Sequence, residues 1–186
     1  MTLVKVRSRG INLADDFAFS GTITGAGGGK ILAVYQDYVT AQIETSSENT
    51  FVDVTGLAIT LTPASVNSKF LLNFNTVGSN ISGASQALNV ALDFKRAISG
   101  GTTTASIINT TNSSGFNRRY NYDNRSDDLA GINYLNTTFA ISWLDDPDTA
   151  SAITYTCQFM KYQWAGTSGQ TMGLTGGMFQ IMEVAS

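Results

Sequence analysis

The chain has 186 residues, of which 42% are hydrophobic and only 13% are charged, and its formal net charge is −3. This length suits one domain with a sizeable core, and the slight acidity argues against nucleic-acid binding, which normally needs a basic face. The chain has no histidine and a single cysteine, Cys157. This composition excludes an intrachain disulfide, zinc, haem and iron–sulfur ligand sets, and every catalytic triad that needs a histidine, so we expect no cofactor. Because there is no bilayer-length apolar run and no signal-peptide core, we also expect synthesis in the cytoplasm without membrane insertion.

The first thirty residues predict an extended arm. Lys5, Arg7 and Arg9 alternate with Val4 and Val6, which indicates either a solvated edge strand or a basic ribbon that docks on an acidic neighbour. The apolar residues that follow are too interrupted by polar ones to bury themselves, so a partner must cover them. These residues are Ile11, Leu13, Phe17 and Phe19.

The glycine-rich segment 25–30 separates this arm from the rest of the chain. It fails as a phosphate-binding loop, because Thr24 stands where the loop needs its first glycine and Ile31 where it needs Ser or Thr. A flexible joint is the better interpretation, since glycine leaves the backbone unrestricted. We therefore divide the chain into an arm with its joint, residues 1–30, and a body, residues 31–186.

The body alternates apolar and polar residues with a period of two, which is typical of strands that have one buried face. Expected strands cover residues 31–43, 57–61, 70–74, 88–94, 137–144, 153–164 and 178–184. Turn residues separate them at the spacing typical of sandwiches and barrels, and no segment indicates a long helix. The pattern predicts an all-β, antiparallel fold.

Strands 137–144 and 153–164 predict a hairpin at the centre of a sheet, because Asp and Pro in the acidic segment 145–148 favour turns. Cys157 has the apolar parity of its strand and is expected to be a small buried residue, and Trp143 is likewise expected in the core. The closing strand 178–184 has two apolar faces, which indicates a central strand or one at a subunit contact.

Two stretches interrupt the strand pattern. Residues 99–129 predict a long irregular excursion, in which a strand over 105–108 is an option, and residues 166–177 predict a second loop. On the expected strand 88–94, which precedes the first of these stretches, Asp93 is expected to face solvent. Arginine beside aromatic residues is typical of contact surfaces, although a plain loop with surface tyrosines is the alternative. The candidate receptor-contact residues are Phe116, Arg118, Arg119, Tyr120 and Tyr122, with Trp164 as the candidate for glycan binding.

Several segments resemble bacteriophage virion proteins. Residues 56–71, and residues 143–147 followed by 153–155, resemble segments of tail-fibre and related proteins, and the ending 182–184 is similar to theirs. The opening 9–17 resembles the starts of structural proteins from phages of marine bacteria. The resemblance implies a jelly-roll-like β-sandwich, similar to the tumour-necrosis-factor architecture, often trimeric and displayed on the virion. Typical fibres have a long shaft or a large virion-binding domain before the tip, whereas about thirty residues precede the body here.

These observations lead us to expect a structural virion protein and not an enzyme. The first expectation is a homotrimeric tail-fibre or short appendage subunit, whose arm binds other phage structural proteins and whose body contacts a host-surface glycan or protein. A capsid decoration (head-stabilising) protein and a non-catalytic carbohydrate-binding module are the alternatives. A glycosidase would need two carboxylates about 5–10 Å apart, and turn formation explains the aspartates at 127–128 and 145–148. A calcium site at 145–148 does not match an EF-hand loop, so no metal is expected.

Overall fold

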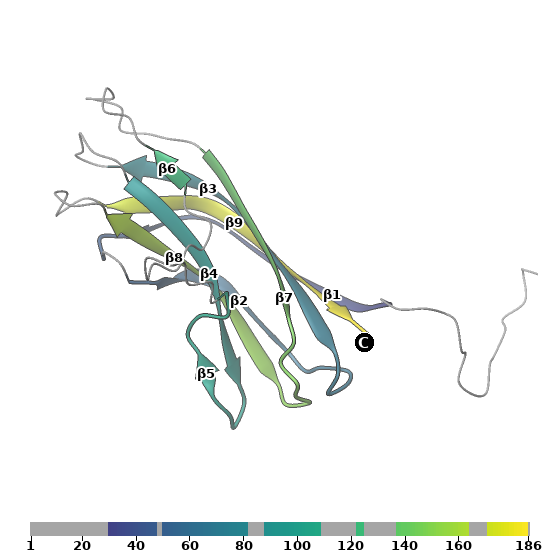
Figure 1. The fold of residues 1–186 in the computed structure, drawn as a ribbon. Helices are drawn as coiled ribbons and strands as arrows, with labels where there is room; N and C mark the ends of the chain where they lie inside the picture. The colour runs from purple at the N-terminus through teal and green to yellow at the C-terminus, as the bar shows by residue number, and fades with distance from the viewer. Residues whose placement is uncertain are drawn as a thin grey trace, which may run out of the picture.

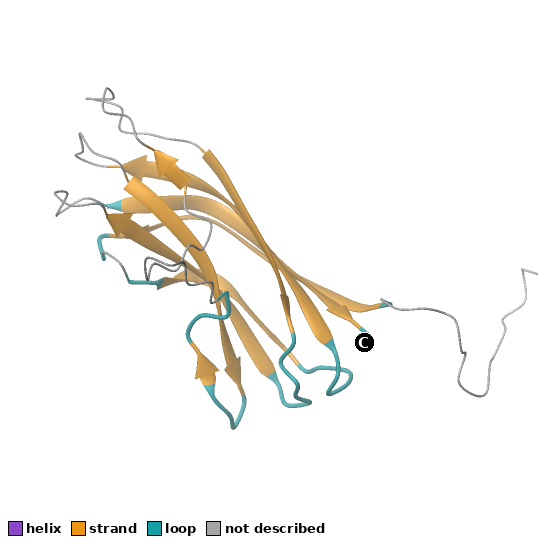
Figure 2. Ribbon diagram, in the orientation of Figure 1, coloured by secondary structure: helices purple, strands orange, loops and turns teal. Residues whose placement is uncertain are grey.

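The computed structural model of the protein describes residues 30–47, 50–81, 88–108, 122–124, 137–163 and 171–185. Throughout these ranges the chain forms only strands and loops (Figure 2), which confirms the all-β prediction, and they contain no helix that could cross a membrane. The strands are β1 (Ile31–Thr45), β2 (Val52–Leu61), β3 (Lys69–Ile81), β4 (Leu88–Ile98), β5 (Thr103–Thr104), β6 (Tyr122–Asn124), β7 (Thr137–Asp145), β8 (Ile153–Gln163) and β9 (Met172–Val184).

The strands form two antiparallel sheets that stack as a sandwich (Figure 1). The first sheet has the order β1-β9-β3-β7, and the second has the order β2-β8-β4-β5, with β6 also paired to β4. From β1 to β4, and again from β7 to β9, each strand lies in the opposite sheet from the one before it. Such crossing connections are those of a jelly roll, so the predicted jelly-roll-like sandwich is confirmed.

The predicted hairpin of 137–144 and 153–164 is wrong. Strand β7 pairs with β3 at the edge of the first sheet, whereas β8 lies between β2 and β4 in the second. The alternation of apolar residues determines which side chains are buried, but it does not determine which strands pair. Segment 146–152 crosses between the layers instead, and Asp148 takes a left-handed conformation in it, with φ of 49°.

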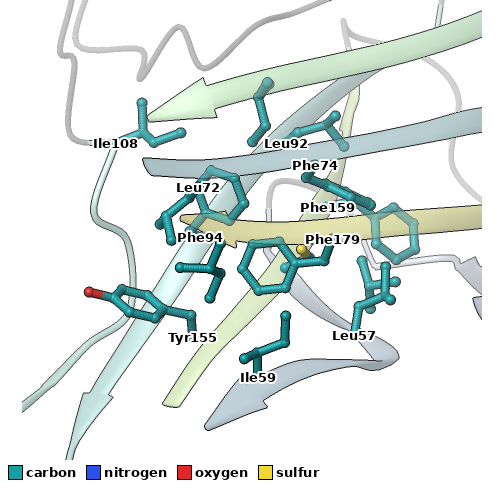
Figure 3. Close-up of a cluster of buried hydrophobic side chains, with 14 of the residues drawn as sticks. Leu57, Ile59, Leu72, Phe74, Leu92, Phe94, Ile108, Tyr155, Phe159 and Phe179 are labelled. Atoms are coloured by element: carbon teal, nitrogen blue, oxygen red, sulfur yellow. The ribbon is translucent and has the colours of Figure 1, made fainter. Parts of the chain in front are cut away.

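The core fills the space between the two sheets, as Figure 3 shows. Phe94 of the second sheet stacks on Phe179 of the first, with ring centroids 5.5 Å apart. Cys157 is fully buried, as predicted, and this burial raises the pKa of its thiol. Trp143 is only partly buried against the core. Fully or almost fully buried apolar residues come from both sheets: Leu57, Phe70, Leu72, Phe74, Leu92, Tyr155, Phe159 and Ile181.

Strand β9 runs through the middle of the first sheet, between β1 and β3, which is the first of the two options that the two apolar faces of 178–184 predicted. It begins at Met172, so the second half of the loop predicted for 166–177 is wrong. Gly176 has φ of 70°, at a register shift in the pairing with both neighbours. At Gly177 a Cβ would lie 3.0 Å from Phe74 and 3.1 Å from Leu57. Glycine here permits a bulge and close packing within a strand.

The prediction that Asp93 faces solvent is also wrong, because this side chain is fully buried. Its Oδ1 accepts hydrogen bonds from the backbone N–H groups of Phe94, at 2.7 Å, and Ile108, at 3.2 Å. The segment before Ile108 follows the edge of β4, where the Ile107 N–H bonds to the carbonyl oxygen of Phe94 at 3.0 Å. This segment is not the optional strand at 105–108, and the nearby strand is β5.

Candidate interaction surfaces

One end of the sandwich holds both described ends of the chain, and we call it the proximal end (Figure 1). Val184 near the C-terminus pairs with Ile31 on one side and with Lys69 on the other. The Ala185 N–H also bonds to the carbonyl oxygen of Lys30 at 2.9 Å. Described connections at this end cover residues 62–68, 99–102 and 146–152. Residues 1–29 therefore join the body at the proximal end.

The opposite, distal end gathers the attachment points of other segments. Leu88 pairs with Asn124 of β6 and with Gln163 of β8. Gly78 pairs with Thr137 of β7. The residues that flank segments 125–136 and 164–170 are therefore close together at the distal end, about the length of a strand away from the arm's attachment.

Most predicted site residues lie outside the described part of the chain. Tyr122 belongs to β6, where its backbone pairs with Val90, and this places it at the distal end. Outside the described residues are the predicted docking residues Lys5, Arg7, Arg9, Ile11, Leu13, Phe17 and Phe19, and the candidate contact residues Phe116, Arg118, Arg119, Tyr120 and Trp164.

The outer side of the first sheet presents a surface that we call the neutral face. Paired residues of antiparallel neighbours point to the same side of a sheet, so the register defines rows across β1, β9, β3 and β7. The first row is Val34, Met182, Leu71 and Leu144; the second is Gln36, Gln180, Asn73 and Ser142; the third is Tyr38, Met178, Asn75 and Ala140. None of these twelve side chains is charged.

Apolar side chains on the neutral face are open to solvent. The exposed fractions are 55% for Val34, 54% for Leu144 and 70% for Tyr38. In the middle row the Ser142 hydroxyl donates to Asn73 Oδ1 at 2.5 Å, which is a bond between two polar side chains of the face itself. The sequence signalled this surface only through the second apolar face of 178–184, because the other rows become visible only once the strands are paired.

A buried polar cluster joins the sheets near the proximal end. The Arg96 guanidinium on β4 donates from Nη1 to both carboxylate oxygens of Asp145 on β7, at 2.7 and 2.8 Å. The Tyr155 hydroxyl on β8 donates to Asp145 Oδ2 at 2.7 Å. Burial, together with this bond to a carboxylate, raises the pKa of Tyr155 well above its ordinary value. Asp145, a residue of the acidic segment, thus binds the Arg96 and Tyr155 side chains of the opposite sheet and has a structural role.

Two further charged pairs, Lys95 with Asp53 and Lys69 with Asp146, lie nearer the surface. Burial alone would raise the pKa of Asp53, but its bonds with Lys95 and Gln158 outweigh burial and lower it below 3.8. At the proximal end Lys69 pairs with Asp146 at 2.9 Å, beside a shallow hollow. Within the described ranges, no group of three His, Cys, Asp or Glu residues is placed to hold a metal ion.

No protein-family model matches the chain, and no curated protein matches it significantly. The structure of infectious bursal disease virus Gt strain is similar with a TM-score of 0.45 and 11% identity, over 92% of this chain and 42% of that one. The crystal structure of the VP2 subviral particle of the same virus is similar with a TM-score of 0.45 and 14% identity, over 81% and 32%. The chain thus spans less than half the length of these structures.

Proposed function

We propose that the chain is a structural virion protein, and specifically a tail-fibre or short appendage subunit of a bacteriophage. In this proposal the arm attaches the body to the particle, and the distal end contacts the host surface. The main support is the placement of attachment points: the arm joins the body where Ile31 pairs with Val184. The segment with Phe116, Arg118, Arg119 and Tyr120 leads into Tyr122 at the other end, where Gln163, which precedes Trp164, also lies. A body with its tether and its candidate contact loops at opposite ends is suited to projection from a surface.

The sequence supports the same proposal independently. Segment 56–71, which resembles tail-fibre proteins, spans the end of β2, the turn after it and the start of β3. In the structure Leu57, Ile59 and Phe70 of this segment are buried in the core, so the resemblance lies in residues that define the sandwich. The arm, in which polar residues interrupt Ile11, Leu13, Phe17 and Phe19, has the composition of a segment that needs a partner.

Attachment is tested by deleting residues 2–29 and measuring incorporation of the shortened protein into particles. We expect loss of incorporation while the body remains folded by circular dichroism, because strands β1 to β9 and the core that the described residues form between the two sheets do not include residues 2–29. A matched control replaces exposed Val66 in the proximal turn with Ala, which leaves the arm intact. Normal incorporation of the deletion variant would refute attachment through the arm.

Host contact is tested separately, by replacing Arg118, Arg119, Tyr120 and Tyr122 with Ala. The expected result is impaired adsorption at normal particle yield, because these residues are the candidates for receptor contact. Unchanged adsorption would refute their role and favour the alternative proposal of capsid decoration.

The observation in favour of that alternative is the neutral face, since a decoration layer needs lateral contacts between subunits. Copy number per particle separates the two, because an appendage has few copies and a capsid layer has hundreds.

A further inference from the structure

We propose that the neutral face is the surface through which copies of this chain pack against one another. The inference deepens the proposed function by assigning self-association to a specific surface. It can fail while attachment through the arm holds, and the reverse is also true, because the face and the arm are changed by different variants.

The absence of charge on the face favours an identical partner. Charged residues make up 13% of the chain, yet three successive rows over four strands contain none. A partner of opposite charge would find nothing to pair with there, whereas two copies of a neutral face meet without like-charge repulsion. The middle row strengthens this argument, because Gln36, Gln180 and Asn73 each carry donor and acceptor groups and can therefore bond to their own kind.

The apolar residues of the face explain why it needs covering. A sheet face in contact with water is normally polar, in alternation with the buried face. Here Val34, Leu144 and Tyr38 are each more than half exposed, and they lie in rows with Met182 and Met178. Aromatic residues and methionine are enriched in interfaces, and charged residues are depleted from interface centres. The neutral face therefore has the composition of an interface centre.

The size and border of the face suit a contact between subunits. Four strands about 4.8 Å apart and three rows about 6.7 Å apart give roughly 400 Å² of flat area, and protruding side chains increase the accessible area towards the roughly 800 Å² that each partner buries in a standard interface. Exposed Ile31 and Leu32 extend the apolar surface at the proximal end. At the border Lys69 and Asp146 pair with each other, which matches the polar rim of an interface.

The test measures the mass of the full chain in solution by sedimentation velocity. We expect the unaltered protein to be an oligomer, with a mass at least twice the 19.8 kDa of one chain. Val34→Lys and Leu144→Lys each place a charge within the contact, on the two edge strands of the face. Each should weaken association at least about a hundredfold, since like charges brought together cost several kcal/mol. Val66→Lys is the matched control, because Val66 is a similarly exposed valine (44%) outside the face, and it should keep the mass of the unaltered protein.

A second measurement detects the covered face directly. Ala140→Cys places a thiol on the neutral face, and Thr60→Cys places one at an exposed position of the second sheet. The native Cys157 is buried and does not compete for reagent. Maleimide should label residue 140 several times more slowly than residue 60 in the assembled protein, and Val34→Lys should remove this difference.

Three outcomes would overturn the inference. A monomeric unaltered protein would do so, even if Val34→Lys reduced incorporation into particles, because the face would then bind another virion protein. Retention of the full mass by both lysine variants of the face, with folding confirmed by circular dichroism, would also do so. The third outcome is an oligomer that is lost when residues 2–29 are deleted but kept in the lysine variants, which would assign self-association to the arm.

Discussion

Replacing Asp145 with Ala should destabilise the sandwich strongly, because this carboxylate holds two groups of the other sheet. In the native protein it accepts two bonds from Arg96 and one from Tyr155, all at 2.7–2.8 Å. The side chains of Arg96 and Asp145 are only 18% and 8% exposed. Alanine would leave a guanidinium and a phenol hydroxyl near the core without their acceptor.

The expected cost is about 3–4 kcal/mol, since removal of one partner of a buried pair typically costs 3–5 kcal/mol and Arg96 retains some contact with water. Total stabilities of domains are about 5–15 kcal/mol, so this loss would be a large fraction of the whole. Tyr155→Phe should cost about 1 kcal/mol, because it removes one hydrogen bond while the ion pair remains.

Urea denaturation followed by tryptophan fluorescence measures these costs. With a slope of about 2 kcal/mol per molar urea, Asp145→Ala should lower the midpoint by roughly 2 M. Asp146→Ala is the matched control at the next residue, because Asp146 forms an exposed pair with Lys69, and exposed pairs contribute about 0–1 kcal/mol. A loss below about 1 kcal/mol for Asp145→Ala, or equal losses for the two variants, would refute the idea that the cluster ties the sheets together.

Three further predictions concern single positions. Because the folded-state pKa of Asp53 is lowered, its contribution is present above its ordinary pKa of 3.8 and is lost as pH falls through the folded value; Asp53→Asn should flatten the acid limb of stability against pH, and an unchanged limb would refute this. Cys157, with its raised thiol pKa, should react with a disulfide reagent only after unfolding, so rapid reaction in native buffer would contradict its burial. Gly177→Ala should cost about 1–3 kcal/mol, as overpacking does, because its Cβ would press on Phe74 and Leu57; an unchanged denaturation midpoint would contradict the close packing.

Strand locations could be predicted from the sequence because one buried face produces a period of two. Leu57, Phe74 and Phe159 are buried as their parity required. Pairing could not be predicted in the same way, since a strand with one apolar face fits either layer of a sandwich. The hairpin at 145–148 therefore looked reasonable, whereas in the structure Asp145 bonds to the sheet that contains β8.

The candidate surfaces show the same limit. The neutral face includes residues such as Val34 and Leu144, which are 110 positions apart in the chain. They share one row of the face only because of the register of β9 and β3 between them. Strand parity places Asp93 toward solvent, yet the side chain is buried. It is covered by a segment that follows the strand edge without alternation and whose Ile108 N–H bonds to the Asp93 carboxylate. The alternation of residues along one strand indicates which of its side chains are buried. A surface built from several strands can be located only when the order and register of those strands are known.

In the proposed function, the body stands on the particle with its proximal end inward. This orientation is tested most directly by binding of an antibody to intact virions that carry one short epitope, inserted either at 99–102 in a proximal turn or at 46–50 in the distal connection of β1 and β2. We predict that the distal epitope is bound at full copy number and that the proximal one is bound only after the particles are dissociated. Equal binding of both epitopes on intact virions, or binding of the proximal one alone, would contradict the proposed orientation.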